Sequence, residues 1–403
     1  MTAFPAEPVT EAGQRFVDAA RAVSPLLRER AAAADDASAM DPANVRLLVE
    51  SGVASAFVPE SLGGLGLDCI HDWALGMSSL GQGDGSTAIA INMHLGVSRG
   101  LAAGWHASGG TSAPLGEQLR AIVRGDMLIC ATATERGTDN LHPLTEASLA
   151  DGGYRIDGTK LFVTLSPVAT HLGMNLRLRN DEGDHLVTTL LPIGMPGIQP
   201  QGDWQALGMR ASGSQSIVFD NVRIPKQALR HLGPWGRWST TSLTNRALGN
   251  LTLVGVFLGI AEHAAELALT SLRQQKRNGR PAAELPGVRH MTGEMAIELA
   301  TCRDVLLATA RRADAFLRVP QPTLAQSHEL MRDYQTAKWV VNRGAINIVN
   351  TAMDLVGGSS YMQSSTLSRL YRDVRAGPFM QPGARPEARE YIGRVALGDY
   401  PED

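Results

Sequence analysis

The sequence predicts an α+β protein in which a helical region, a β region and a helical bundle follow one another. Apolar residues first recur with helical spacing, short alternating β-branched segments replace them near Asp126, and long helical patterns resume after Pro225. The chain of 403 residues has room for two or three domains. We expect an N-terminal α-helical domain, a middle β-barrel domain and a C-terminal four-helix bundle, over residues 1–126, 127–235 and 236–403.

Composition and charge narrow the class of protein. Hydrophobic residues make up 44% and charged residues 19%, as in ordinary globular enzymes. A net charge of −3 gives no basic footprint for nucleic acid. The longest apolar run, residues 247–261, is too short to span a bilayer, and the N-terminus lacks the apolar core of a signal peptide. We expect a cytoplasmic protein with no membrane or nucleic-acid partner.

The three cysteines, Cys69, Cys130 and Cys302, lie far apart in the chain. This spacing predicts neither a disulfide framework nor a zinc site, and it fits a reducing compartment. We therefore expect no metal.

The N-terminal region predicts helices over residues 10–50, with a break before Asp41-Pro42, and then over residues 71–80, 88–103 and 115–123. The glycine cluster in residues 52–68 is expected to form a loop, because no strand–GxGxxG–helix unit surrounds it. His94 falls within a predicted helix. A lone histidine there is more often structural than catalytic, and both readings stay open.

The β region contains short alternating segments separated by turn residues. Asp157-Gly158 gives the strongest hairpin signal. Strands of this length and number predict an antiparallel domain. The segments are MLICATAT, YRIDGTKLFVT, THLGMNLRL, HLVTTLLPI and QSIVFDNVRIP.

The C-terminal region predicts a bundle whose pattern is interrupted by Gly357-Gly358 and by an irregular segment, residues 376–386. A glycine pair lets another backbone or a ligand come close, although it also serves simply to separate packed helices. The expected helices cover residues 242–276, 286–318, 322–356, 362–375 and 388–396.

Six local motifs occur in one order: VPESLGGLGLD, ATATERGTDN, GTKLFVT, DWQALGMRASGSQSIVFDNVRIP, LVGGSSY and LYRDVR. In that order they resemble the acyl-CoA dehydrogenase superfamily over essentially the whole chain. Each motif alone is weak, and an unrelated α+β protein is the alternative.

The resemblance implies a flavin between the β domain and the bundle. By this resemblance, Thr164 would meet flavin N5 and Thr134 the pyrimidine side. Phe162, in place of the family's tryptophan, offers a flat apolar neighbour for the ring system. The alternative is that threonine is simply a good strand residue.

The resemblance also shows what is missing. Dehydrogenases of the family place a glutamate base in one of two positions, and here these hold Gln381 and Asn245. Neutral amides cannot accept a proton near pH 7. The substrate wall implied by the resemblance is formed by Phe379, Met380 and Gln381.

The grip on the cofactor's adenosine half also departs from the family. Asn278 stands where the family has a Phe and Pro286 where it has a Gln, although Lys276 or Arg277 would compensate after a one-residue shift. Asp354 replaces a glutamine near the pyrophosphate. Gly357 and Gly358 would approach a flavin bound by a neighbouring subunit. We expect FAD or FMN, reduced, exchangeable and supplied by a separate flavin reductase.

These departures resemble the two-component flavin monooxygenase branch, which forms a flavin C4a-hydroperoxide in a dry pocket. His94 and Gln381 would serve there as neutral donors. The closest resemblance is to amino-sugar N-oxygenases (nitrososynthases) of antibiotic pathways, which implies a small amine or a nucleotide-linked amino sugar as substrate and a homotetramer. The alternatives are an acyl-CoA dehydrogenase with a displaced base and a catalytically silent partner subunit.

Overall fold

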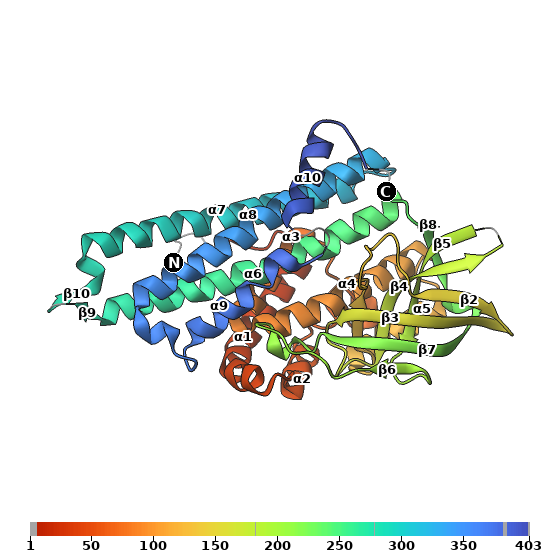
Figure 1. Cartoon of the computed structure of the whole chain (residues 1–403), viewed down its shortest axis with the longest axis horizontal. Coiled ribbons are helices and arrows are strands. Elements are labelled where there is room, and N and C mark those ends of the chain that lie inside the picture. The colour runs from red at the N-terminus through yellow and green to blue at the C-terminus, as the bar shows by residue number, and fades with distance from the viewer. Residues whose placement is uncertain (1–5, 182, 278, 382–384, 402–403) are drawn as a thin grey trace.

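The computed structural model describes residues 6–181, 183–277, 279–381 and 385–401. The long helices of the C-terminal region run side by side along the molecule, and the β sheet lies at one end of them (Figure 1). The N-terminal helices pack between the two. The α+β architecture predicted from the sequence is confirmed.

The N-terminal region folds as predicted, because polar side chains cap its helices. The Thr10 hydroxyl accepts from Gly13 N, and the Asp41 carboxylate accepts from Ala43 N at the expected break. The Asp84 carboxylate caps α4 by accepting from Thr87 N at 2.9 Å. The helices are α1 Glu11–Ala37, α2 Pro42–Glu50, α3 Ile70–Gly83, α4 Gly85–Ala107 and α5 Ala113–Arg124.

The β region forms one sheet with strand order β6-β7-β3-β2-β4-β5-β8, and β1 pairs with β4 off this path. The predicted antiparallel pairing is found between most of the described strands, but β1 and β2 both run parallel to β4. Those two strands share one edge of β4 in succession. The strands are β1 Ile129–Thr132, β2 Glu146–Ala150, β3 Gly153–Val163, β4 His171–Asn180, β5 Gly183–Pro192, β6 Ile198–Pro200, β7 Gln215–Pro225 and β8 Arg230–Pro234.

The hairpin predicted at Asp157-Gly158 was wrong. β3 runs through this dipeptide, and its pairing with β7 shifts between Ile156 and Gly158. Gly158 has φ +146°, and a Cβ there would lie 2.7 Å from the backbone of Thr145. The glycine therefore serves a bulge. The tight turn instead uses the earlier Asp151-Gly152, between the paired residues that end β2 and begin β3.

The C-terminal bundle has the predicted helices: α6 Thr240–Gln274, α7 Pro286–Leu317, α8 Leu324–Val356, α9 Thr366–Val374 and α10 Arg385–Ala396. α6 contains the apolar run that the sequence marked as too short for a membrane, and as a 35-residue helix it is long enough. Its most apolar 18-residue window is 83% buried within the protein. Packing therefore accounts for its hydrophobicity.

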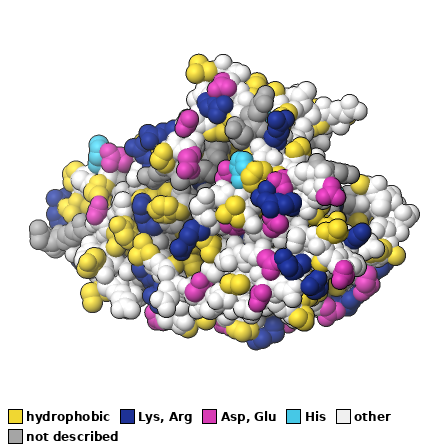
Figure 2. Space-filling model, turned by 45° about the vertical axis from the view of Figure 1, so that its right-hand side comes forward, with side chains coloured by type: hydrophobic (Ala, Val, Ile, Leu, Met, Phe, Trp, Pro, Cys, Tyr) yellow, Lys and Arg dark blue, Asp and Glu magenta, His cyan; other side chains and the backbone are white. Residues whose placement is uncertain are grey.

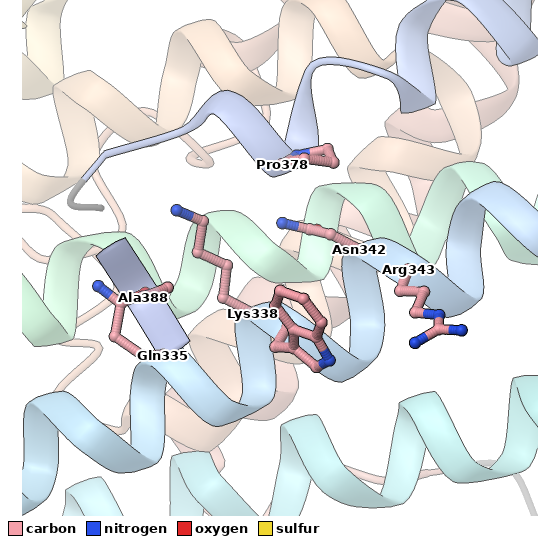
Figure 3. A pocket seen from close by; sticks show the side chains of 7 residues that line it. Gln335, Lys338, Asn342, Arg343, Pro378 and Ala388 are labelled. Atoms are coloured by element: carbon pink, nitrogen blue, oxygen red, sulfur yellow. The ribbon is translucent and has the colours of Figure 1, made fainter. Parts of the chain in front are cut away.

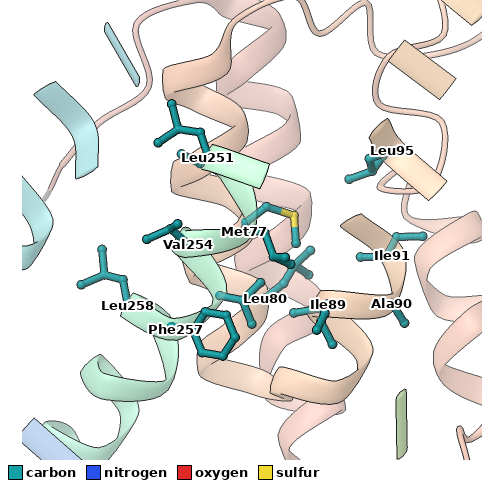
Figure 4. Packing of buried hydrophobic residues seen from close by; sticks show 14 of the residues in the cluster. Met77, Leu80, Ile89, Ala90, Ile91, Leu95, Leu251, Val254, Phe257 and Leu258 are labelled. Carbon is teal, nitrogen blue, oxygen red and sulfur yellow. The ribbon is translucent and has the colours of Figure 1, made fainter. Parts of the chain in front are cut away.

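The main core joins α3, α4 and α6 (Figure 4). Met77, Leu80 and Phe257 are fully or almost fully buried there. Gly259 lets α6 come close to α3, because a Cβ at this position would lie 2.1 Å from Ser78 O. Burying each large apolar side chain contributes about 2 kcal/mol, so this seam fixes the N-terminal helices firmly on the bundle.

The surface carries charges of both signs. On the face shown in Figure 2, basic and acidic side chains are interspersed, and no region of a single sign dominates. This distribution agrees with the small net charge of the chain.

Candidate active site

The edge predicted to meet the flavin lies where the loop after β1 passes the end of β3. Thr134 forms an isolated bridge with Leu161, and Thr164 forms one with Ala131. The Thr164 hydroxyl is buried and lies 2.9 Å from Ser214 Oγ, so it is already engaged. Thr134 is partly exposed, and its hydroxyl has no hydrogen-bond partner among the described residues. Thr134 thus offers the freer donor.

The backbone at the end of β3 is strained beside this edge. Phe162 has φ +52° and Leu165 has φ +79°, and neither is glycine. Such conformations cost about 1–3 kcal/mol each and tend to occur at functional sites. They leave the Phe162 ring 56% exposed, with only an edge contact to Trp204 at 6.0 Å between centroids. An exposed ring beside polar donors suits a flat ring system such as a flavin.

A buried ion pair ties the loop after β1 to β3. Lys160 Nζ lies 2.5 Å from Glu135 Oε1, and both side chains are almost fully buried. Glu135 also accepts from the backbone N–H groups of Leu144 and Thr145. The loop that carries Thr134 and Asn140 is thereby fixed on the sheet.

The predicted substrate wall is a short segment held from behind by α8. Tyr334 Oη donates to Gln381 O at 2.9 Å, and Lys338 Nζ donates to Met380 O. Burial lowers the pKa of Lys338 to about 8. Figure 3 shows Lys338 and Asn342 pointing from α8 toward the chain that carries Pro378, around a small pocket on this rear side.

Two of the three side chains of the wall are exposed. Phe379 is 70% exposed, Gln381 is exposed, and Met380 is partly buried against the core. Residues 382–384 of the predicted irregular segment lie outside the described residues. The wall is therefore gripped through its backbone while its side chains remain available.

A polar cluster links the wall, the loop and the start of α6. The side-chain amides of Asn140 and Gln381 lie 3.2 Å apart. When the Asn140 amide is oriented so that it donates to Ala133 O, its oxygen accepts from Arg246 Nη1. Asn245, the other amide at a base position, directly precedes Arg246 in α6 and is exposed. The structure thus places the Gln381 amide at a cluster that adjoins Asn245.

Arg246 was not singled out by the sequence analysis. Its guanidinium lies 5.7 Å from the centre of the Trp238 ring and forms no ion pair with any described carboxylate. Burial lowers its pKa to about 10, which leaves it charged at neutral pH. The only sequence signal was its position beside Asn245.

His94 occupies a different environment from the one predicted. It is fully buried, and Nε2 lies 2.9 Å from Ala54 O while Nδ1 accepts from Ile129 N at 3.1 Å. Burial lowers its pKa to about 4, so the ring is neutral. Because both ring nitrogens are occupied, this geometry joins α4 to β1 and provides no free donor for catalysis.

Within one chain, the residues predicted to hold the adenosine half of the cofactor lie away from the predicted flavin edge at Thr134. Lys276 is exposed on the hairpin of β9 Lys276–Arg277 and β10 Arg280–Pro281, at the end of the bundle opposite the sheet (Figure 1). Gly357, with φ +86°, and Gly358 follow α8, and a Cβ on either would meet open space. One chain does not bring these residues to Thr134.

The LYRDVR motif anchors α9. Arg369 pairs with Asp84 at 3.3 Å, and Arg372 pairs with Asp35. Asp373 Oδ1 accepts from Met209 N at 2.6 Å. Burial raises the pKa of Asp373 to about 7. The motif therefore fastens α9 to the N-terminal helices and to the loop before β7.

One buried group of side chains has the spacing of potential metal ligands: Cys69, His71 and Asp72. Asp72 already accepts from Val9 N, Thr10 N and the Thr10 hydroxyl, and it lies 2.8 Å from His71 Nδ1. The Cys69 thiol donates to Asp314. These contacts explain the group as a structural link between α1, α3 and α7.

Fold and site together define a flavin-dependent oxidoreductase. Profiles of the N-terminal, middle and C-terminal domains of acyl-CoA dehydrogenase match residues 10–105, 129–222 and 242–397. The chain belongs to the acyl-CoA dehydrogenase family.

Individual relatives cover almost the full chain. Amino sugar nitrososynthase DnmZ of Streptomyces peucetius is 34% identical, over 97% of this chain and 95% of the relative. L-evernosamine nitrososynthase of a Micromonospora species is 32% identical, over 97% and 92%. The solved structure of KijD3 with FMN and dTDP-3-amino-2,3,6-trideoxy-4-keto-3-methyl-D-glucose is 30% identical, covers 98% of this chain and 96% of its own, and has a TM-score of 0.90.

Proposed function

We propose that this protein is a flavin-dependent monooxygenase that oxygenates the amine of a nucleotide-linked amino sugar. The observation that carries the proposal is that both positions where the dehydrogenases hold a glutamate base carry exposed amides, Gln381 and Asn245. Without a carboxylate there, the α-proton of an acyl thioester has no acceptor.

An N-oxygenation needs no such base. Reduced flavin supplies two electrons and activates O2, one oxygen atom is added to the amine nitrogen, and the other leaves as water. The chain's own residues would bind the flavin edge through Thr134, Thr164 and Phe162 and would exclude water with Phe379 and Met380. Gln381 and Asn245 would contribute neutral hydrogen-bonding groups.

The relatives support this substrate class. Two of those described above are named nitrososynthases, and the solved KijD3 complex holds FMN with a dTDP-linked amino sugar. These names support an amino sugar of secondary metabolism, including antibiotic biosynthesis, as the substrate of this chain.

Several accompanying properties form part of the proposal. FMN or FAD would arrive reduced from a separate flavin reductase in the cytoplasm, because the residues expected to hold the adenosine half depart from the family pattern. A homotetramer would bring Lys276, Arg277, Gly357 and Gly358 of a neighbouring copy to the flavin edge.

The test uses the purified chain with FMN, a flavin reductase, NADH and a dTDP-linked amino sugar. We expect a product heavier by one oxygen atom, labelled from ¹⁸O2 and absent when the reductase is omitted. Rapid mixing of the reduced complex with oxygen should give a transient absorbance unlike that of reduced or oxidised flavin. Anaerobic bleaching of bound flavin by an acyl thioester, with no oxygenated product, would overturn the proposal in favour of a dehydrogenase.

A further inference from the structure

Arg246 of the polar cluster and the neighbouring ion pair of Lys160 and Glu135 together hold more positive than negative charge. Lys160 is neutralised by Glu135 at 2.5 Å, but Arg246 forms no ion pair with a carboxylate of the residues that the structure describes. The two cations influence each other, since Arg246 helps to lower the pKa of Lys160. The group formed by Lys160, Glu135 and Arg246 thus carries one unbalanced positive charge.

The surrounding groups do not remove this excess. In the loop, Asp139 interacts electrostatically with Arg246, but it is exposed and hydrogen-bonded to His142 and to the backbone. From α8, Tyr334 is buried with a raised pKa and stays neutral, while Lys338 adds a further cation. The carboxylate of Glu387 in α10 interacts electrostatically with Lys338 and favours its charged form.

The excess follows from the same substitutions that remove the base. A glutamate at position 381 would stand beside Asn140, the residue whose amide contacts Arg246. Glutamine preserves the shape but not the charge. A carboxylate at position 381 would offset this cation, whereas the neutral glutamine leaves it to act on whatever enters the site.

We propose that Arg246, left without a facing carboxylate, makes the site bind the substrate amine as the free base and expel its proton. This inference rests on the proposed function and names Arg246 as the residue that sets the protonation state of the substrate. Oxygen transfer to nitrogen requires the lone pair, which an ammonium ion lacks. A fixed cation at short range repels the ammonium form and leaves the neutral amine bound.

The expected shift is large enough to measure. A like charge within about 4–6 Å changes a titration midpoint by roughly one to three pH units. At one pH unit below the amine's solution midpoint, about nine-tenths of the ligand is ammonium. Binding as the free base then releases about 0.9 proton per ligand.

Titration calorimetry in buffers of different ionisation enthalpy measures that release directly and without turnover. The ligand is a dTDP-linked amino sugar, and dTDP, which lacks the amine, reports protons released by the protein itself. For the natural sequence we expect a net release that rises from about 0.4 proton for a shift of one pH unit to about 0.9 proton for a shift of three.

Two variants change the charge in different ways. Arg246→Gln removes the cation, and Gln381→Glu supplies a carboxylate at an exposed position where folding is not at stake. Each should lower the net release toward zero and move the lower limit of the pH–rate profile for oxygenation upward by about one unit or more. Arg246→Lys should keep most of the release, and Lys226→Gln, at an exposed site, should leave it unchanged.

The outcomes separate the two claims. If the amino sugar binds and is oxygenated but proton release is near zero in the natural sequence, or is unaltered by both charge-changing variants, the role of Arg246 is refuted and the proposed function stands. If the ligand neither binds nor yields an oxygenated product, the proposed function itself fails.

Discussion

Two polar clusters in this molecule treat charge in opposite ways. Around α9, Arg369 meets Asp84, Arg372 meets Asp35, and Asp373 meets a backbone N–H. Beside the wall, the Arg246 guanidinium contacts an amide and an aromatic ring and pairs with no carboxylate in the described part of the chain. The first cluster joins helices and exposes little, whereas the second borders residues with exposed side chains.

The difference distinguishes charged side chains that stabilise the fold from charged side chains that are available to a ligand. A buried charge with a matched partner stabilises one arrangement, and removing either member leaves the other uncompensated. A charge without a partner is costly in the folded state and persists where a ligand interacts with it. Partner matching therefore distinguishes these two clusters better than burial does.

The largest expected effect tests this contrast through stability. Arg369→Met or Asp84→Asn should lower the free energy of unfolding by about 3–5 kcal/mol, because each leaves a buried charge unpaired. Arg246→Met should change it by less than about 1 kcal/mol, since no opposite charge is left unpaired. Guanidinium denaturation followed by circular dichroism measures both. Equal losses of unfolding free energy for variants of the two clusters would contradict the distinction between paired and unpaired charges.

A second effect concerns the pH dependence of the α9 anchor. The pKa of Asp373 is raised to about 7, mainly by burial, so between about pH 4 and pH 7 the folded state binds more protons there than the unfolded state. Its contribution to stability is present below pH 4 and is lost as the pH rises through 7. Relative to Asp373→Asn, the natural sequence should lose about 3 kcal/mol between pH 4.5 and pH 7.5.

Denaturation curves of the two proteins across that range provide the comparison. The asparagine keeps an oxygen for Met209 N, so its curve supplies the baseline from all other groups. Parallel curves would mean that the carboxylate titrates as an ordinary aspartate.

The smallest effect concerns His94, which is fully partnered but uncharged. His94→Gln should cost about 1–3 kcal/mol of stability, because it leaves Ala54 O or Ile129 N without its partner. The rate of amine oxygenation by the folded variant should stay within about threefold of the natural rate. A loss of oxygenation in a well-folded variant would restore the catalytic role predicted from the sequence.

The sequence predicted the helices well because their signals are local. Thr10, Asp41 and the apolar spacing fix the starts and faces of α1 and α2 before any distant contact forms. The strand pairing of the sheet was harder to predict from the sequence. Two Asp-Gly pairs, at residues 151–152 and 157–158, look alike locally, and only the pairing of β3 with β7 decides which one turns.

The site was predictable where the resemblance fixed positions and unpredictable where distant segments meet. Gln381 and Asn245 were recognised as amides, but the contacts of Gln381 with Asn140 and Tyr334 depend on three separate parts of the chain. The isolation of Arg246 is a property of everything around it. No single residue pattern carries that information.

The manner in which α8 holds the wall bears on how such enzymes diverge. Tyr334 and Lys338 bind the carbonyl oxygens of Gln381 and Met380, which every amino acid possesses. Residue identity along the wall can therefore drift while the course of the chain stays constant. Under the proposed function, an exchange between glutamate and glutamine at position 381 would alter the chemistry of the site while the backbone contacts of α8 stay the same.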